Sequence, residues 1–254
     1  MPAIGPYSLP QVYAAFARKA MIDDIEMTAR AEYSIERQAA VSAALASVFR
    51  GKFCDLILPN RKSVIYKKHQ VIYEVGDKGR TFIFLQSGFA KVGTITASGR
   101  EVIYDVRKGG DVVGELCAGE HTRLDRAVAL EDTETVPVPF EDVIGILSTS
   151  PRVLPTFLDV FCQALREAYE QVNTLAIDDM VQRLKKVLLA LATKLGRRTG
   201  SLVEIPTYLT QEEIAQMVGA RRERISTALN SLRRQGMVHY STRGHLVLDM
   251  AAFE

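Results

Sequence analysis

Cysteine is scarce in this sequence and is not arranged for cysteine chemistry. The 254 residues include three cysteines, Cys54, Cys117 and Cys162, which are far apart and form no C-x-x-C pair. A disulfide framework and a zinc site built from cysteine both need paired or clustered cysteines, so both classes are excluded. We expect the three side chains to be buried as small apolar groups.

Long apolar segments are absent too. No run approaches the roughly 20 residues that cross a membrane, and the N-terminus has no basic start followed by an apolar stretch and a cleavage site. The composition is 47% apolar and 24% charged, with a net charge of +2. We therefore expect a cytoplasmic protein with no membrane segment, large enough for two domains with separate cores.

The strongest pattern lies near the C-terminus. Thr210 is a good N-cap residue followed by acidic residues, and Gly219 follows an apolar face formed by Ile214 and Val218, as a turn glycine does. The pattern predicts a short helix that ends in a tight turn, after which a second amphipathic run begins.

That second run has one apolar and one polar face. Its apolar positions recur at i, i+4 and i+7 as Ile225, Leu229 and Leu232. The outer face carries Glu223, Thr227 and Asn230, flanked by Arg222 and Ser226. Two short helices joined at a glycine, with a polar outer face on the second, indicate a helix-turn-helix that suits a DNA major groove.

Basic charge is concentrated around this segment. Residues 221–243 contain six arginines and a single acid, Glu223, in a chain of net charge +2. A basic run alone is more often a solvated helix face, but one on the outside of a helix-turn-helix favours phosphate binding. The expected partner is double-stranded DNA, and the candidate contacts are Thr210, Gln211, Arg221, Arg222, Glu223, Ser226, Thr227 and Arg243.

A hairpin is expected after the second helix. Residues 237–240 and 245–248 are short β-prone runs joined by a polar, glycine-containing loop, which indicates a wing. His239 and His245 have no cysteine and no acidic partner at ligand spacing, so we expect structural histidines and no metal site.

Residues 56–140 consist of short β-rich runs cut by glycine at regular intervals, which predicts an antiparallel barrel. Its closing segment could bind a cyclic nucleotide. Gly114 would let the backbone approach a ligand, the Glu115 carboxylate would accept from a ribose hydroxyl, and Arg123 would contact a phosphate.

In combination, these features resemble the catabolite activator/FNR (CRP/FNR) superfamily of bacterial transcription regulators over roughly residues 56–250. The motifs that carry the resemblance are Gly76-Asp77, Ser87-Gly88, Gly114-Glu115-Leu116, the segment 129–134, the long helix after Pro151, and the helix-turn-helix with Arg222-Glu223. The resemblance implies an α+β fold: an antiparallel β-roll of the cyclic-nucleotide-binding jelly-roll type, a long dimerisation helix and a C-terminal winged helix-turn-helix.

The implied organisation has four parts. They are a helical N-terminal extension over 1–55, a sensor roll over 56–150, a dimerisation helix over 151–178 and a DNA-binding domain over 179–254. Within the last part we expect a helix over 183–195 and a loop over 196–201. The resemblance implies a dimeric, sequence-specific transcription regulator that binds a palindromic promoter site and has RNA polymerase as a further partner.

The long helix supports a dimer independently of the resemblance. Apolar residues recur in steps of four and three, as in a coiled-coil seam: Leu154, Leu158, Phe161, Leu165, Ala168, Val172 and Leu175. A second line, Phe157, Val160 and Ala164, is left to face the roll.

The sequence departs from the cyclic AMP-binding members of the superfamily. They follow the phosphate-contacting Arg with Ser or Thr and supply Thr-Ser from the long helix, whereas our alignment, with a two-residue deletion before Arg123, places Leu124, Ala168 and Tyr169 there. With a one-residue insertion instead, Arg126 takes the phosphate role and Ala127 follows it. The candidate effector residues are Gly114, Glu115, Leu116, Arg123, Leu124 and Tyr169.

Several interpretations of this region stay open. In one interpretation, this region binds another cyclic nucleotide or dinucleotide, or haem. In the other, it binds no ligand and consists of a turn of the fold with a surface ion pair. An FNR-type iron–sulfur cluster is excluded because residues 1–53 contain no cysteine, and Cys117 with His121 gives haem no convincing ligand spacing. We therefore assign no certain cofactor.

The alternative from a different class is a non-catalytic regulatory subunit of an enzyme. We expect no catalysis by this chain, because it contains no activated nucleophile, paired carboxylate set or phosphate loop.

One base contact differs from the superfamily pattern. The resemblance implies that an Arg-Glu pair at the start of the recognition helix reads G and C, while a later Arg reads a second G. Arg222 and Glu223 keep the pair, but Thr227 stands at the later position. Threonine makes one hydrogen bond or touches a thymine methyl, so the outer base preference should relax or change.

Overall fold

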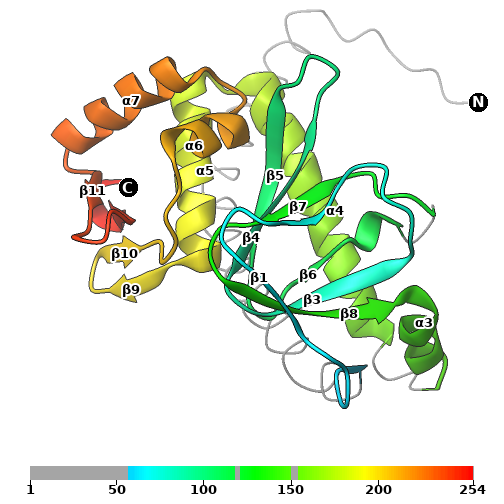
Figure 1. Cartoon of the computed structure of the whole chain (residues 1–254). Helices are drawn as coiled ribbons and strands as arrows, with labels where there is room; N and C mark the ends of the chain where they lie inside the picture. Colours follow the sequence, from blue (N-terminus) through cyan, green and yellow to red (C-terminus); the bar gives the residue numbers. More distant parts are fainter. Residues whose placement is uncertain (1–56, 118–120, 150–153, 254) are drawn as a thin grey trace, which may run out of the picture. The chain divides into compact units, whose positions relative to one another are not determined.

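A computed structural model describes residues 57–117, 121–149 and 154–253. The helical extension expected over residues 1–55, which includes Cys54, lies outside the described residues. The described residues contain three four-stranded antiparallel sheets and five α-helices longer than one turn (Figure 1). None of the helices in these described ranges is long and apolar enough to cross a membrane.

Two of the sheets form the roll. One has the order β1 (Val64–Tyr66), β8 (Thr133–Pro139), β3 (Thr81–Ser87) and β6 (Val112–Val113). The other has the order β2 (Val71–Tyr73), β7 (Arg126–Ala129), β4 (Phe89–Ile95) and β5 (Glu101–Lys108). Every pairing is antiparallel, which confirms the expected architecture.

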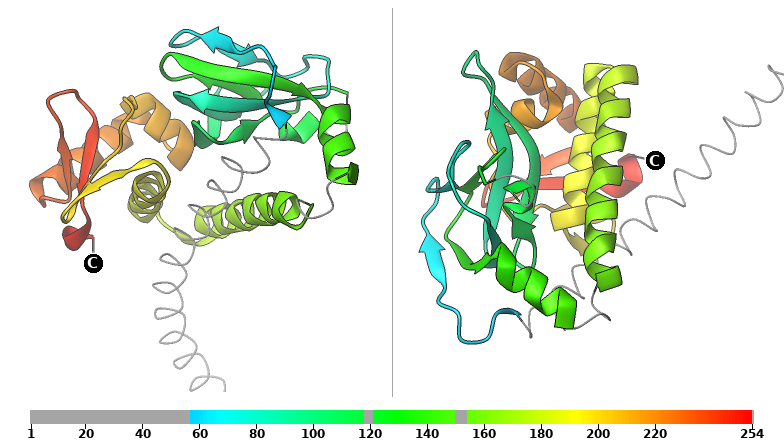
Figure 2. Two further views of the ribbon diagram at one scale, coloured as in Figure 1. Left: turned by 90° about the horizontal axis from the view of Figure 1, so that it is seen from below. Right: turned by 90° about the vertical axis from the view of Figure 1, so that its right-hand side faces the viewer.

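Strand β3 shows why the roll has a continuous apolar run at 82–85. Successive side chains of a strand point to opposite faces. Ile83 and Leu85 belong to the core between the two sheets, together with Tyr73 and Val92. Phe82 and Phe84 belong to a second core with Val143 and Leu147 of α3 (Phe140–Thr149). The sequence analysis did not anticipate this helix, which lies beside the roll in Figure 2.

The segment after the roll is helical. The 3-10 helix η2 (Glu115–Cys117) interrupts the roll, and α4 (Leu154–Ile177) is the expected long helix. Cys162 on α4 is exposed, so the expected burial of the cysteines is wrong at this position. Helix α5 (Met180–Leu195) begins three residues before the expected start, because the Asp179 side chain accepts from the N–H groups of Val181 and Gln182.

The DNA-binding module contains α6 (Gln211–Val218), α7 (Arg222–Arg234) and a small sheet of order β11 (Val238–Tyr240), β12 (Leu246–Asp249), β10 (Leu202–Glu204) and β9 (Arg197–Thr199), with η4 (Met250–Ala252) after it. The loop expected over 196–201 is wrong in part, since β9 pairs with β10 in a hairpin. All three β9 side chains are exposed, so no alternation of apolar residues marks it.

Candidate nucleic-acid interface and effector site

The first helix of the helix-turn-helix is closed at both ends. Thr210 Oγ1 accepts from the Glu213 N–H at 3.1 Å, and a Glu213 carboxylate oxygen accepts from the Thr210 N–H at 2.9 Å, forming a capping box. At the other end Gly219 has φ 69°, the left-handed conformation that glycine adopts without strain. The predicted cap and turn are both confirmed.

Helix α7 has the buried apolar face and the exposed polar face that the sequence pattern predicted. Ile225, Leu229 and Leu232 are buried in the module's core. The candidate contacts Arg221, Arg222, Glu223 and Thr227 are exposed, Ser226 is half-buried, and Arg243 is exposed in the wing. The polar face is therefore presented to solvent on a rigid support, as a DNA-reading surface requires.

Two candidate contacts, Thr227 and Thr210, already use their side chains in hydrogen bonds within the chain. The Thr227 hydroxyl donates to the Glu223 carbonyl at 3.0 Å, and the Thr210 hydroxyl is part of the capping box. Gln211, half-buried, begins α6 beside Thr210. Thr227 would have to give up this bond to donate its hydroxyl hydrogen to a base, whereas its oxygen can accept a hydrogen bond and its methyl group can touch a base with no such change.

The wing forms as expected, with β11 and β12 antiparallel. His245 Nδ1 lies 3.0 Å from a Glu204 carboxylate oxygen, and His239 Nε2 lies 2.9 Å from the Gly236 carbonyl oxygen. Both histidines are tied into the module, and the described residues contain no cluster of three metal-ligating side chains.

In the roll, Arg123 is buried beneath the Gly114 turn and is only 6% exposed. Its Nη1 donates to the Gly114 carbonyl at 2.8 Å, and its Nη2 donates to the Thr81 carbonyl at 2.7 Å. The guanidinium carbon also lies 4.4 Å from the centre of the Tyr73 ring. The possibility of a surface ion pair at Arg123 is therefore wrong, because burial and backbone carbonyls hold this side chain inside the roll.

Glu115 has a different basic partner. Its Oε1 lies 3.2 Å from Arg107 Nη2, and Arg107 Nε lies 2.8 Å from Asp105 Oδ2. Burial alone would raise the pKa of Asp105, but Lys194 and Arg107 outweigh it and hold that pKa below its usual range. The second oxygen of Glu115, Oε2, is buried and has no hydrogen-bond partner among the described residues.

Asp125 adds a second carboxyl group to this region. It is 2% exposed, and its burial, together with repulsion by Glu115, raises its pKa to about 6 against the opposing influence of Tyr73 and Arg123. Burial, Asp125 and Glu115 in turn raise the pKa of the Tyr73 hydroxyl. Sequence reasoning missed Tyr73, Arg107 and Asp125, although an acid between Arg123 and Arg126 was a visible signal.

The remaining candidates do not gather around Arg123. Leu116, Leu124 and Tyr169 are all exposed, by 49%, 53% and 62% respectively. The rival phosphate ligand Arg126 is already paired, with Nε 3.1 Å from Glu74 and Nη1 3.6 Å from Glu101. The structure therefore brings together Gly114, Glu115 and Arg123 and leaves the other three at the surface.

This arrangement is less favourable for the phosphate of a cyclic nucleotide than an arginine with all its donors free. Each amino group of Arg123 already donates one hydrogen to a backbone carbonyl, and the Asp125 and Glu115 carboxyls would repel an added anion. A ligand hydroxyl, in contrast, finds an acceptor in Glu115 Oε2. The residues suit a hydroxyl group better than a phosphate.

Two family models match the chain. Residues 63–150 match the cyclic nucleotide-binding domain, and residues 182–254 match the Crp-like helix-turn-helix domain, together more than half of the sequence. The chain belongs to the CRP/FNR superfamily. This CRP/FNR member is therefore a DNA-binding transcription regulator with a cyclic-nucleotide-binding-type sensor domain, and not an enzyme.

Curated relatives of this CRP/FNR chain are regulators as well. The CRP-like cAMP-activated global transcriptional regulator of Mycobacterium tuberculosis is 27% identical over 210 residues, covering 81% of the chain and 94% of the relative. The global nitrogen regulator of Nostoc sp. is 26% identical over 198 residues, covering 77% and 88%.

Solved structures show the same fold. FixK2 from Bradyrhizobium japonicum has a TM-score of 0.65 at 21% identity, covering 74% of this CRP/FNR chain and 92% of FixK2. The c-di-GMP-responsive regulator CLP from Xanthomonas campestris has a TM-score of 0.63 at 21% identity, covering 75% and 95%.

Proposed function

We propose that this regulator binds a palindromic promoter site as a dimer joined through α4. The observation that carries the proposal is an apolar stripe left uncovered in the single chain. Leu158, Leu165, Val172 and Leu175 are each at least 52% exposed. The first three repeat every seven residues and Leu175 follows three residues after Val172, which is the spacing of a coiled-coil seam. The second predicted line, Phe157, Val160 and Ala164, has side chains outside the described residues.

Two copies of the recognition helix would read two half-sites about one helical turn, roughly 34 Å, apart. We assign base reading to Arg222, Glu223, Ser226 and Thr227. Contacts with phosphate are assigned to Thr210, Gln211, Arg221 and Arg243. Their exposure and the local excess of arginine support this division of roles.

Changing Leu165 and Val172 together to Lys tests the proposal. Four like charges would enter the dimer seam, so light scattering should report monomers, and affinity for a palindrome should fall at least about 100-fold with the loss of simultaneous half-site binding. Asn173→Lys adds a charge at an exposed position beside the seam and serves as the control. A dimer of unchanged mass in the double variant would contradict the proposal.

We further propose that the effector is not cyclic AMP. The engaged guanidinium of Arg123, the two acids beside it and the apolar Leu124 support a nucleotide-type ligand of another kind, recognised through a hydroxyl at Glu115. Another cyclic nucleotide or dinucleotide has this chemistry. Haem gains no support from the described residues, and the side chain of Cys117 lies outside them.

Titration calorimetry with cyclic AMP should therefore show no binding, or a Kd far weaker than micromolar. Each missing hydrogen bond costs roughly 0.5–1.5 kcal/mol, so two or three lost contacts weaken a ligand by one or more decades. Denaturing mass spectrometry of the purified protein identifies a ligand that is retained. Micromolar binding of cyclic AMP would contradict this assignment.

The remaining assignments follow from membership of the superfamily. We propose the division into a roll over 56–150, a dimerisation helix over 151–178 and a DNA-binding domain over 179–254. RNA polymerase as a partner and a cytoplasmic location belong to the same proposal.

A further inference from the structure

The β4–β5 hairpin of the roll contacts both ends of α6, the first helix of the DNA-binding helix-turn-helix. Near the start of α6, Lys91 Nζ from β4 lies 3.4 Å from a Glu213 carboxylate oxygen. At the other end, the Arg100 guanidinium, just before β5, donates to the Ala220 carbonyl in the turn at 2.8 Å. The hairpin therefore holds the helix that supports the recognition helix.

The two carboxylate oxygens of Glu213 have different partners. Its Oε2 accepts from the Thr210 N–H and hydroxyl, both at 2.9 Å, and its Oε1 faces Lys91. The residue is 6% exposed. A carboxylate buried to this degree is stable in its charged form only beside a positive group, and Lys91 supplies that group.

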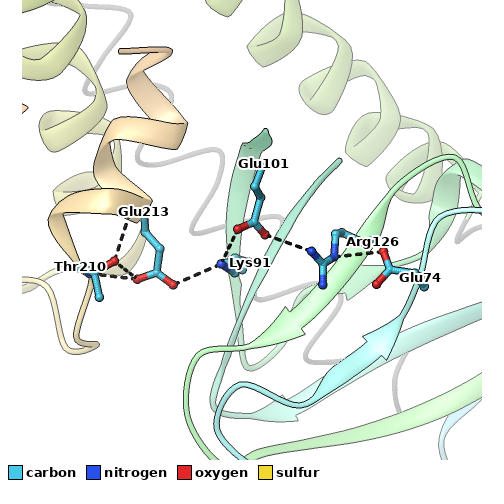
Figure 3. A network of polar contacts seen from close by, with 6 residues as sticks. All are labelled: Glu74, Lys91, Glu101, Arg126, Thr210 and Glu213. Atoms are coloured by element: carbon cyan, nitrogen blue, oxygen red, sulfur yellow. Dashed lines mark hydrogen bonds and ion pairs between the residues drawn. The ribbon is translucent and has the colours of Figure 1, made fainter. Parts of the chain in front are cut away.

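Lys91 is itself held from the side of the roll. Its Nζ lies 3.0 Å from Glu101 Oε2, the other oxygen of Glu101 lies 3.6 Å from Arg126, and Arg126 lies 3.1 Å from Glu74. Figure 3 shows this line of alternating charges running from the roll to the capping box of α6. The ammonium group is therefore placed between one acid of the sensor and one acid of the DNA reader.

Apolar residues reinforce the same contact. Val106 of β5 and Leu130, which follows β7, belong to the hydrophobic core of the DNA-binding module with Ile214 and Ile225, and Phe89 of β4 packs against this core. Because the roll contributes side chains to that core, the orientation of the module depends on the hairpin as well as on its own helices.

We propose that Lys91 is a positioning residue for DNA reading. Through Glu213 it fixes the orientation of α6, and hence of α7, relative to the roll. The inference rests on the proposed two-fold binding of a palindrome, since two readers in a dimer match two half-sites only when each is held at a set orientation. It predicts that Lys91, which is not one of the assigned base-reading residues, controls which separation of the two half-sites the dimer prefers.

The test compares palindromes whose half-sites are separated by the best spacing or by one base pair more or less, about 3.4 Å each way. The wild-type dimer should bind the best spacing sharply. Lys91→Met should weaken that complex about tenfold and flatten the preference among the three spacings. Glu213→Gln should act alike, because glutamine keeps the capping hydrogen bonds while losing the ion pair. The double variant should be no worse than Glu213→Gln alone.

Lys67→Met is the matched control. Lys67 forms an ion pair with Asp132 that is exposed on both sides and lies wholly within the roll, so the spacing profile should not change. Circular dichroism confirms folding. If Lys91→Met does not fold, the spacing profile of Glu213→Gln tests the inference. An unchanged spacing profile in a folded Glu213→Gln dimer would overturn the inference. Failure of the wild-type protein to bind any palindrome would instead refute the proposed function.

Discussion

In the roll, Arg123 is buried and its guanidinium donates to the carbonyls of Gly114 and Thr81. On the recognition helix, Arg222 and its neighbour Arg221 are exposed at the start of α7. The same side chain type therefore stabilises a turn in one region and is presented to solvent in the other. The contrast shows that an arginine at a family ligand position does not by itself make a phosphate site. Its donors must also be available.

The two regions also differ in the number of acidic residues near their arginines. Around Arg123 lie Glu115, which is paired with Arg107, and the buried Asp125, whose pKa is raised to about 6, so these acids offset the positive charge of the two arginines. Around α7, Glu223 is the single acid between residues 221 and 243. DNA binding by this regulator thus rests on a preformed basic surface, whereas the proposed effector would have to be compatible with carboxyl groups.

The largest expected effect is a loss of stability when the turn that packs on the buried Arg123 is changed. Gly114→Ala forces a side chain onto φ 84° and would put its Cβ 2.2 Å from Arg123 Nη1. We expect the free energy of unfolding to fall by about 3–4 kcal/mol, because left-handed strain adds to overpacking. Gly99→Ala is the control, since its φ is 77° and nothing lies within 4 Å. It should cost only about 1–2 kcal/mol. Equal losses in chemical denaturation would show that Arg123 moves aside freely.

The next effect is the pH dependence produced by Asp125. Its pKa is about 6 in the folded protein and about 4 in an unfolded chain, so the folded state keeps a proton that the unfolded state has lost between these values. The stability contributed by this group is present below pH 4 and is lost as the pH rises through 6.

Asp125→Asn should remove that loss. As the pH rises from 4 to 7, the unfolding free energy of this variant should increase by about 2 kcal/mol relative to that of the wild type. Asp132→Asn, at a carboxyl whose pKa is lowered by Lys67, should give a nearly constant difference from pH 5 to pH 7. A flat profile for Asp125→Asn would show that folding does not raise the pKa of Asp125.

The smallest expected effect is at the exposed arginines. Arg222→Ala should leave unfolding unchanged and reduce discrimination at one base pair about tenfold, roughly 1.4 kcal/mol, in a selection from random sites. Arg243→Ala, the control, should weaken all sequences alike and lower the salt slope by about one. Strict selection of the outer guanine by the wild type would show that Thr227 does not read that base.

Much of the fold could be predicted because local signals and long-range structure agreed. Thr210, Gly219 and the Ile225 stripe specify the helix-turn-helix by cap, turn and period. Helix α3 was missed because its apolar residues follow directly on strand β8, so no boundary is visible. Strand β9 was missed because an exposed edge strand needs no apolar alternation.

The candidate effector site was less predictable for a different reason. Gly114, Glu115 and Arg123 could be selected from their order in the chain, but Arg107 and Tyr73 join them only through the sheet pairing. Whether a guanidinium is free depends on which carbonyls approach it in space. No spacing rule records that the Thr81 carbonyl lies 2.7 Å from Arg123.

The two helices of the helix-turn-helix begin in different ways. The capping box closes α6, whereas Arg221, the N-cap of α7, supplies no side-chain hydrogen bond to the first turn. Unpaired first-turn N–H groups point outward and attract anions. A DNA phosphate that accepts from them would complete the helix. We therefore expect the amides of Arg222 and Glu223 to exchange hydrogen rapidly in the free protein and slowly in the complex, so that the recognition helix reaches its full length only on its target.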